Sequence, residues 1–270
     1  MVNKYHLELT GEKLADSKRR LRAVKREKVQ EEVLAKAQEK VDQMEKESET
    51  GFEFATVESF GFKEGESFFF VDTIEKFEQV APKFDDAKVV SIDFIYGGAL
   101  VSTITLASDS VVAVFDMLTL STKDDVKDWV QAKMNDENLD KVTHSFVHDV
   151  EKFQKLIKTE PEDLKGFLEL SDIIKDEKEE ERKLSLIWMA EHYLKKSFNK
   201  AWNRFDWIFR PMHPGQINYA ATLAVVQLKV FLKFSEESKG KHSYFEYQIP
   251  SPKQSTKRRK GGKRKRSEKK

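Results

Sequence analysis

The chain has 270 residues, of which 39% are hydrophobic and 35% charged, with a net charge of +1 and no cysteine. This length suits one large domain or two small ones with a substantial core. The absence of cysteine excludes disulfides, zinc–thiolate sites and a thiol nucleophile. No stretch resembles a signal peptide or reaches the ~18 apolar residues of a membrane span, so we expect a soluble intracellular protein without a membrane partner.

The net charge conceals an asymmetry between the two ends of the chain. Residues 251–270 contain eleven Lys or Arg and one Glu, a net of +10, which leaves −9 for the first 250 residues. An acidic body does not indicate a general nucleic-acid-binding surface. The basic character therefore belongs to the tail.

Residues 12–49 are dense in Glu, Lys, Arg, Ala and Gln and contain neither Pro nor Gly, which predicts one long charged helix. Its apolar residues form two short heptad registers that Lys28 and Glu31 interrupt, so they fall short of a sustained coiled coil. Two interpretations stay open for residues 1–50: a solvated helix, or a helix that binds a protein partner or a second copy. Gly51 ends the helix, and residues 51–67 are expected to form a linker whose phenylalanines pack onto the following domain.

A folded α/β domain is predicted for residues 68–236. Residues 88–92 form a nearly continuous, β-branched apolar run, which is typical of a strand buried on both faces. Asp93 ends this run. Because an unpaired buried charge is unfavourable, Asp93 is either the cap of the next loop or a carboxylate held by hydrogen bonds or by a metal.

The remaining elements of this domain follow from local patterns. Further strands are predicted at 68–71, 100–106, 111–115, 141–146 and 167–170, and helices at about 73–84, 122–134, 184–194 and 214–235. Asp149 lies at the start of the helix that follows the strand at 141–146. The helix at 214–235 is apolar nearly all round, which predicts a buried helix.

Three later stretches, together with the Asp93 strand, resemble the 3′–5′ exonuclease domain of the RNase D and Werner type, the tyrosine-containing branch of the DEDD superfamily. They are KVTHSFVHDV at 141–150, LSLIWMAEHYL at 184–194, and the segment 206–221 with its DW, RP and PGQINYAA sequences. The resemblance runs from about residue 68 to 234. It implies a ribonuclease H-like fold, with a mixed sheet of five or six strands and helices on both faces. A long N-terminal helix and a disordered basic tail from residue 237 would be appended to it.

In this family four carboxylates hold two divalent metals that activate water at a phosphodiester. The resemblance places Asp93, Asp149 and Tyr219 at catalytic positions. Ile95 stands where the family has a Glu, and Leu223 stands where it has the last Asp. Neither side chain offers the oxygen ligands that Mg²⁺ requires. We therefore expect no metal or other cofactor; Mg²⁺ or Mn²⁺ on Asp93 and Asp149 would be implied only if the protein is active.

Two groups of basic residues are candidates for contacts with nucleic acid. Arg204 and Arg210 lie in an aromatic segment at 202–210 and are candidate phosphate contacts. In the tail, two clusters flank Gly261-Gly262 and match the short basic pattern of nuclear import signals and nucleic-acid arms, with a merely solubilising tail as the alternative. The cluster residues are Lys257, Arg258, Arg259, Lys260, Lys263, Arg264, Lys265 and Arg266.

Three functions compete. The favoured hypothesis is a degenerate, catalytically weak or inactive exonuclease domain that binds RNA or another single-stranded nucleic acid. It would act as an RNA/protein adaptor in RNA processing or silencing, as inert members of the family do in small-RNA pathways. The alternatives are an active metal-dependent 3′–5′ exonuclease, and a protein scaffold that assembles through residues 12–49. A nuclear or nucleocytoplasmic location is expected from the tail.

Overall fold

The computed structural model describes residues 51–146, 150–157, 163–174 and 185–238, together with a few positions between 28 and 43. The chain divides into two units, residues 1–50 with 199–203, and residues 51–198 with 204–270. In the first unit the described positions between 28 and 43 are helical and exposed, as the predicted charged helix requires. The rest of that helix and the basic tail lie outside the described residues.

The second unit is built on a six-stranded mixed sheet with the order β2-β5-β4-β3-β6-β7. The strand β3 is antiparallel to β4 and parallel to β6. This confirms the predicted mixed sheet. The strands are β2 (Phe68–Val71), β3 (Val89–Gly97), β4 (Leu100–Ala107), β5 (Val112–Asp116), β6 (Asp140–Thr143) and β7 (Phe167–Glu169).

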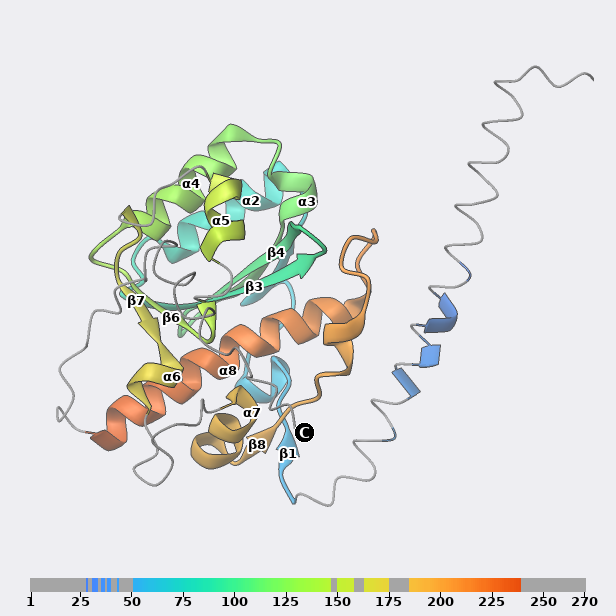
Figure 1. Ribbon diagram of the computed structural model, residues 1–270, viewed down its shortest axis with the longest axis vertical. Helices are drawn as coiled ribbons and strands as arrows, with labels where there is room; N and C mark the ends of the chain where they lie inside the picture. The colour runs from blue at the N-terminus through green and yellow to red at the C-terminus, as the bar shows by residue number, and fades with distance from the viewer. Residues whose placement is uncertain are drawn as a thin grey trace, which may run out of the picture. The chain divides into compact units, whose positions relative to one another are not determined.

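Helices cover both faces of the sheet (Figure 1). On one face lie α2 (Ile74–Val80), α3 (Met117–Leu120), α4 (Asp124–Asn135) and α5 (Val150–Ile157). The long helix α8 (Pro214–Ser238) crosses the other face and packs against β3, β4 and β5. The structure also describes the helices α6 (Leu170–Ile173) and α7 (Leu186–Met189), a π-helical turn at Ala190–Leu194, and 3₁₀ turns at Glu58–Phe60, Ala81–Phe84 and Ala201–Arg204.

The main hydrophobic core lies between the sheet and the first group of helices. On α4, Val126, Val130 and Met134 are buried, and Trp129 is packed against the core. The rings of Phe77 and Trp129 meet edge to face at 5.5 Å between centroids, an arrangement that aromatic pairs favour. These contacts hold α2 and α4 to the same face of the sheet.

The helix α8 is buried along most of its length because the sheet covers one side of it, while α7 and the π-helical turn contact it as well. This confirms the burial that its all-round apolar composition predicts. Among the described residues it is also the one helix long and apolar enough to cross a membrane by length and composition alone. A buried core helix meets the same criteria, and the packing of α8 against the sheet is of that kind.

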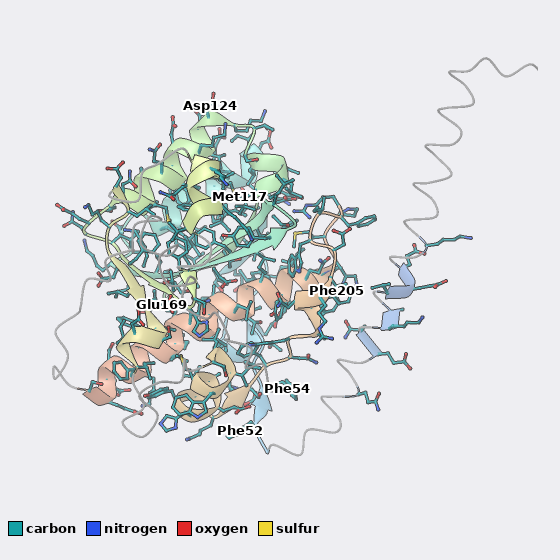
Figure 2. The ribbon with its side chains drawn as sticks, viewed as in Figure 1. Phe52, Phe54, Met117, Asp124, Glu169 and Phe205 are labelled. Atoms are coloured by element: carbon teal, nitrogen blue, oxygen red, sulfur yellow. The ribbon has the colours of Figure 1, made fainter. Side chains whose placement is uncertain are left out.

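Residues 51–67, predicted as a linker, are instead built into the second unit. The strand β1 (Glu53–Phe54) pairs in parallel with β8 (Lys196–Ser197), and Lys196 Nζ lies 2.5 Å from a carboxylate oxygen of Glu53. Val57 and Phe62 are buried, and Glu58 accepts hydrogen bonds from the Asn218 amide of α8 at 3.0 and 3.1 Å. Figure 2 shows Phe52 and Phe54 in this region. As expected, a phenylalanine of this segment, Phe62, packs onto the domain that follows.

Candidate functional site

The strand β3 carries Asp93 on the face that α8 covers. Side chains alternate along a strand, so Ser91, Asp93 and Ile95 share this face, whereas the even-numbered residues pack into the main core. Ser91 Oγ donates to the Ala224 carbonyl at 2.6 Å, and Gln227 Nε2 donates to Asp93 Oδ1 at 2.8 Å. These two hydrogen bonds fix α8 in register on β3.

Three residues spaced four apart, Tyr219, Leu223 and Gln227, occupy one surface of α8. Gln227 is 1% exposed and gives its amide to Asp93. Burial, and in addition the negative charge of Asp93, raise the pKa of the Tyr219 hydroxyl above its ordinary value of 10. The phenol of Tyr219 therefore stays protonated at neutral pH beside the Asp93 carboxylate.

Ile95 and Leu223, the two positions expected to be degenerate, are both buried, at 6% and 9% exposure. Ile95 lies on the α8-facing side of β3, and Leu223 lies one turn before Gln227 on α8. Neither side chain can coordinate a cation or accept a hydrogen bond. These two positions near Asp93 are thus apolar where the family has carboxylates, and Gln227 adds a neutral donor to Asp93.

Buried polar atoms without hydrogen-bond partners surround this contact. Thr105 pairs with Asp93 across the β3–β4 ladder, and Thr103 pairs with Ile95. The hydroxyls of both threonines and Oε1 of Gln227 are buried and, within the described part of the chain, have no hydrogen-bond partner. Each such group lowers the free energy of unfolding by about 1–3 kcal/mol, because it loses its hydration without replacement.

Asp149 lies outside the described residues, so the predicted approach of Asp149 to Asp93 remains a prediction. The segment just before it is fixed by Glu169, at the end of β7 (Figure 2). Glu169 accepts hydrogen bonds from the backbone N–H groups of Ser145 at 2.7 Å and Phe146 at 3.0 Å. This buried carboxylate orders the turn that leads into the second motif.

Sequence reasoning missed both Glu169 and Gln227. The signal available for each was a polar residue in an apolar context: a Glu at the end of a short apolar strand, and a Gln within an otherwise apolar buried helix. Such a residue is expected to have a specific partner, because an unpaired buried polar group is unfavourable. The pattern does not name the partner.

Arg210, a predicted phosphate contact, makes structural contacts within the domain, and its predicted contact with phosphate stays a prediction. Its Nε and Nη2 atoms contact the two carboxylate oxygens of Asp116 at 2.6 and 2.7 Å, and Nη1 donates to the carbonyls of Trp207 and Phe209. Asp116 is 1% exposed. All three guanidinium nitrogens are thus engaged within the protein, which argues against a phosphate on Arg210. Arg204 is exposed, and its predicted role stays a prediction.

The sequence model of the 3′–5′ exonuclease domain matches residues 68–239. The chain belongs to this family. The match extends from β2 through α8 and so includes both elements of the Asp93 contact. No curated protein sequence matches the chain significantly.

Solved structures of exonuclease domains share the fold. The Nibbler EXO domain of Aedes aegypti is 19% identical with a TM-score of 0.59, over 66% of this chain and 91% of that one. The catalytic core of RRP6 from Trypanosoma brucei is 18% identical with a TM-score of 0.54, over 65% and 48%. Escherichia coli RNase D, an exoribonuclease involved in structured RNA processing, is 17% identical with a TM-score of 0.54, over 64% and 45%. The chain thus spans about half of the latter two structures.

The described residues do not fit the two-metal centre of an exonuclease domain. Among them, no group of three or more His, Cys, Asp or Glu residues could hold a metal ion. Asp93 has a hydrogen-bond donor on one of its oxygens, and the side chains at Ile95 and Leu223 supply no oxygen. Magnesium retains near-octahedral oxygen coordination and loses its waters reluctantly. We therefore assign no metal-dependent step to this site.

Proposed function

We propose that this exonuclease domain binds single-stranded nucleic acid, RNA in particular, without cleaving it, and that the protein is an RNA/protein adaptor in RNA processing or silencing. The observation that carries the proposal is the hydrogen bond from Gln227 to Asp93. The Gln227 amide donates to the Asp93 carboxylate, whereas the chemistry of the family requires a divalent cation on this carboxylate. With Ile95 and Leu223 buried beside it, the site retains the fold of a nuclease and lacks the ligands for its reaction.

The choice of RNA rests on the family and on the tail. The chain belongs to the exonuclease-domain family, and Escherichia coli RNase D, which shares its fold, is an exoribonuclease involved in structured RNA processing. The clusters at 257–260 and 263–266 supply the positive charge that the acidic remainder of the chain lacks. We infer that the tail serves as a nucleic-acid arm and as a nuclear address, which gives a nuclear or nucleocytoplasmic protein.

The adaptor function also needs a protein contact. Residues 12–49 form a charged stretch that precedes the matched domain. Where the structure describes them, they are helical and exposed. We assign to this stretch either a protein partner or self-association.

The competing function is an active 3′–5′ exonuclease. Asp93 and Tyr219 are retained, which favours this alternative. It requires Mg²⁺ or Mn²⁺ to bind with the carboxylates that remain. Metal dependence therefore separates the two functions.

Fluorescence anisotropy of the purified full-length chain with a labelled single-stranded RNA tests the proposal. We expect binding in EDTA, with a dissociation constant within about twofold of that in Mg²⁺, because the proposed binding needs no metal. A tenfold change would correspond to about 1.4 kcal/mol. Intact RNA should be recovered from both samples. Absence of binding, or binding that appears only with metal and is accompanied by shortening of the RNA, would overturn the proposal.

A further inference from the structure

We propose that Lys152 on α5 binds a phosphate of the single-stranded nucleic acid at the carboxyl end of β3. This inference rests on the proposed function and names one of its contacts. The residue was not singled out by the sequence motifs. Three features of the structure support the assignment: the position of Lys152, the aromatic ring beside it, and its positive charge.

Lys152 Nζ lies 4.1 Å from the centroid of the Tyr96 ring, and the lysine is partly buried. An ammonium group over an aromatic face is attracted by the ring, so the side chain is held in one place. Within the described part of the chain, no carboxylate forms an ion pair with Lys152. A positioned cation with no carboxylate partner among these described residues is suited to an anionic ligand.

The place of Lys152 is the edge of the sheet at which ligands of α/β folds bind. Tyr96 stands near the carboxyl end of β3, three residues after Asp93, which is about 10 Å of extended strand. The strands β6 and β7 run parallel to β3, so their carboxyl ends reach the same edge. Ligands of open sheets bind outside such carboxyl ends. Tyr96 and Lys152 lie on the α5 side of the sheet and Asp93 lies on the α8 side, so a nucleic-acid strand that crosses this edge towards Asp93 would pass Lys152.

The same end of β3 presents exposed apolar side chains. Leu100 is 55% exposed and pairs with Gly97, and Ile208 is 48% exposed. A Cβ atom on Gly97 would collide with Ile208, so the missing side chain lets the loop lie close against the strand. Apolar surface beside a cation favours a ligand with both phosphates and bases over a free phosphate ion.

The test compares Lys152→Met with Lys155→Met in the full-length chain. Methionine keeps an unbranched apolar side chain and removes the charge, and Lys155 is an exposed lysine of the same helix. The affinity for a labelled single-stranded RNA is measured by anisotropy over a range of salt concentrations. We expect Lys152→Met to make the slope of log K against log salt shallower by about 0.7, the value for one phosphate on a single strand. We expect Lys155→Met to keep the wild-type slope.

An equal slope for Lys152→Met and the wild type would overturn the inference while leaving the proposed function intact. An equally shallower salt slope in both variants would overturn it as well, because the change would then depend only on the net charge of α5. Absence of RNA binding by the wild type would overturn the proposed function and the inference together. A purely structural lysine would alter the unfolding transition and leave the salt slope unchanged, so urea unfolding of each variant is measured in parallel.

Discussion

Gln227, on the buried helix α8, donates a hydrogen bond of 2.8 Å to Asp93 on the central strand, 134 residues earlier in the chain. The pair joins the two elements that carry the family's first and last motifs. Asp93 is the one retained carboxylate of these motifs that the structure describes. The amide of Gln227 neutralises no charge but satisfies one oxygen of Asp93, as we expect of the proposed non-catalytic site.

Replacement of Gln227 by Leu should leave the Asp93 carboxylate without this donor. We expect a decrease of about 2 kcal/mol in the free energy of unfolding, the range for a hydrogen bond to a charged group. Urea unfolding measures it. In the double variant Asp93→Leu with Gln227→Leu, the loss should be smaller than the sum of the two single losses, because no group is left unpaired. Additive losses would show that the two side chains are not coupled.

The hydroxyl of Thr105 is buried without a hydrogen-bond partner in the described part of the chain. Replacement by Val preserves the shape and removes the unsatisfied group, so we expect the free energy of unfolding to rise by about 1 kcal/mol. Thr222→Val is the matched control, because its hydroxyl is hydrogen-bonded to Asn218 Oδ1 at 3.2 Å. That variant should be destabilised. An equal change in the free energy of unfolding for both variants would contradict the conclusion that the Thr105 hydroxyl lacks a hydrogen-bond partner.

Asp116 is almost fully buried and depends on Arg210 for its charge compensation. Arg210→Met should therefore lower the free energy of unfolding by about 3–5 kcal/mol, as for other buried ion pairs that lose one partner. Arg204→Met, at an exposed position, should change it by less than about 0.5 kcal/mol. If Arg210→Met were as stable as the wild type and only its RNA affinity fell, Arg210 would be a nucleic-acid contact.

The buried Lys141 of β6 makes stability depend on pH. Its Nζ donates to the carbonyl of Lys165 at 2.8 Å and to that of Asp136, and burial lowers its pKa from 10.5 to about 8. Below pH 8 both folded and unfolded chains carry the proton. Between pH 8 and 10.5 the unfolded chain binds more protons, so stability rises with pH. Between pH 7 and pH 9.5, Lys141 should therefore raise the free energy of unfolding by about 2 kcal/mol.

Urea unfolding of the wild type and of Lys141→Met at pH 7 and at pH 9.5 measures this contribution. The difference between the two proteins should shift by about that amount in favour of the wild type at the higher pH. Subtracting the variant from the wild type at each pH cancels the contributions of the other titrating groups to stability. The upper limit of pH 9.5 keeps Tyr219 of the folded protein protonated. A difference that is independent of pH would show that Lys141 keeps an ordinary pKa.

Deletion of residues 251–270 should flatten the salt dependence of RNA binding. If about six basic side chains of the tail engage phosphates, the full-length slope is near −4, at about −0.7 for each phosphate. The truncated chain should bind weakly and spread through the cell, whereas the intact chain concentrates in the nucleus. Full affinity with an unchanged slope after truncation would assign the binding to the domain alone, and nuclear retention would remove the role of the tail in targeting.

Local periodicity predicted the sheet well, because it reports which side chains a strand must bury. The alternation of side chains along a strand puts Ser91, Asp93 and Ile95 on one face of β3, and the hydrogen bonds of Ser91 and Asp93 to α8 agree with it. The apolar pattern of α8 likewise predicted its burial. The identity of the fold followed from the order and spacing of motifs, which the family match confirms.

Partners across long sequence separations could not be predicted in this way. The contact of Gln227 with Asp93 depends on how α8 is rotated and shifted on the sheet, which no local pattern specifies. The ion pair of Arg210 with Asp116, 94 residues earlier, was likewise not predicted, because the local sequence identifies Asp116 only as the end of a strand. Residues 51–67 were taken for a linker because the pairing of β1 with β8 joins segments more than 140 residues apart.

The central claim is tested most directly by degradation of a 5′-labelled single-stranded RNA, at protein concentrations above the measured dissociation constant, in Mg²⁺ and in Mn²⁺. Asp93→Ala, purified in parallel, controls for a contaminating nuclease. We expect the RNA to remain bound and full-length with both proteins. Stepwise shortening from the 3′ end by the wild type that disappears in Asp93→Ala would contradict the account, because the site would then hold the metals that its hydrogen bond to Gln227 and its apolar neighbours oppose.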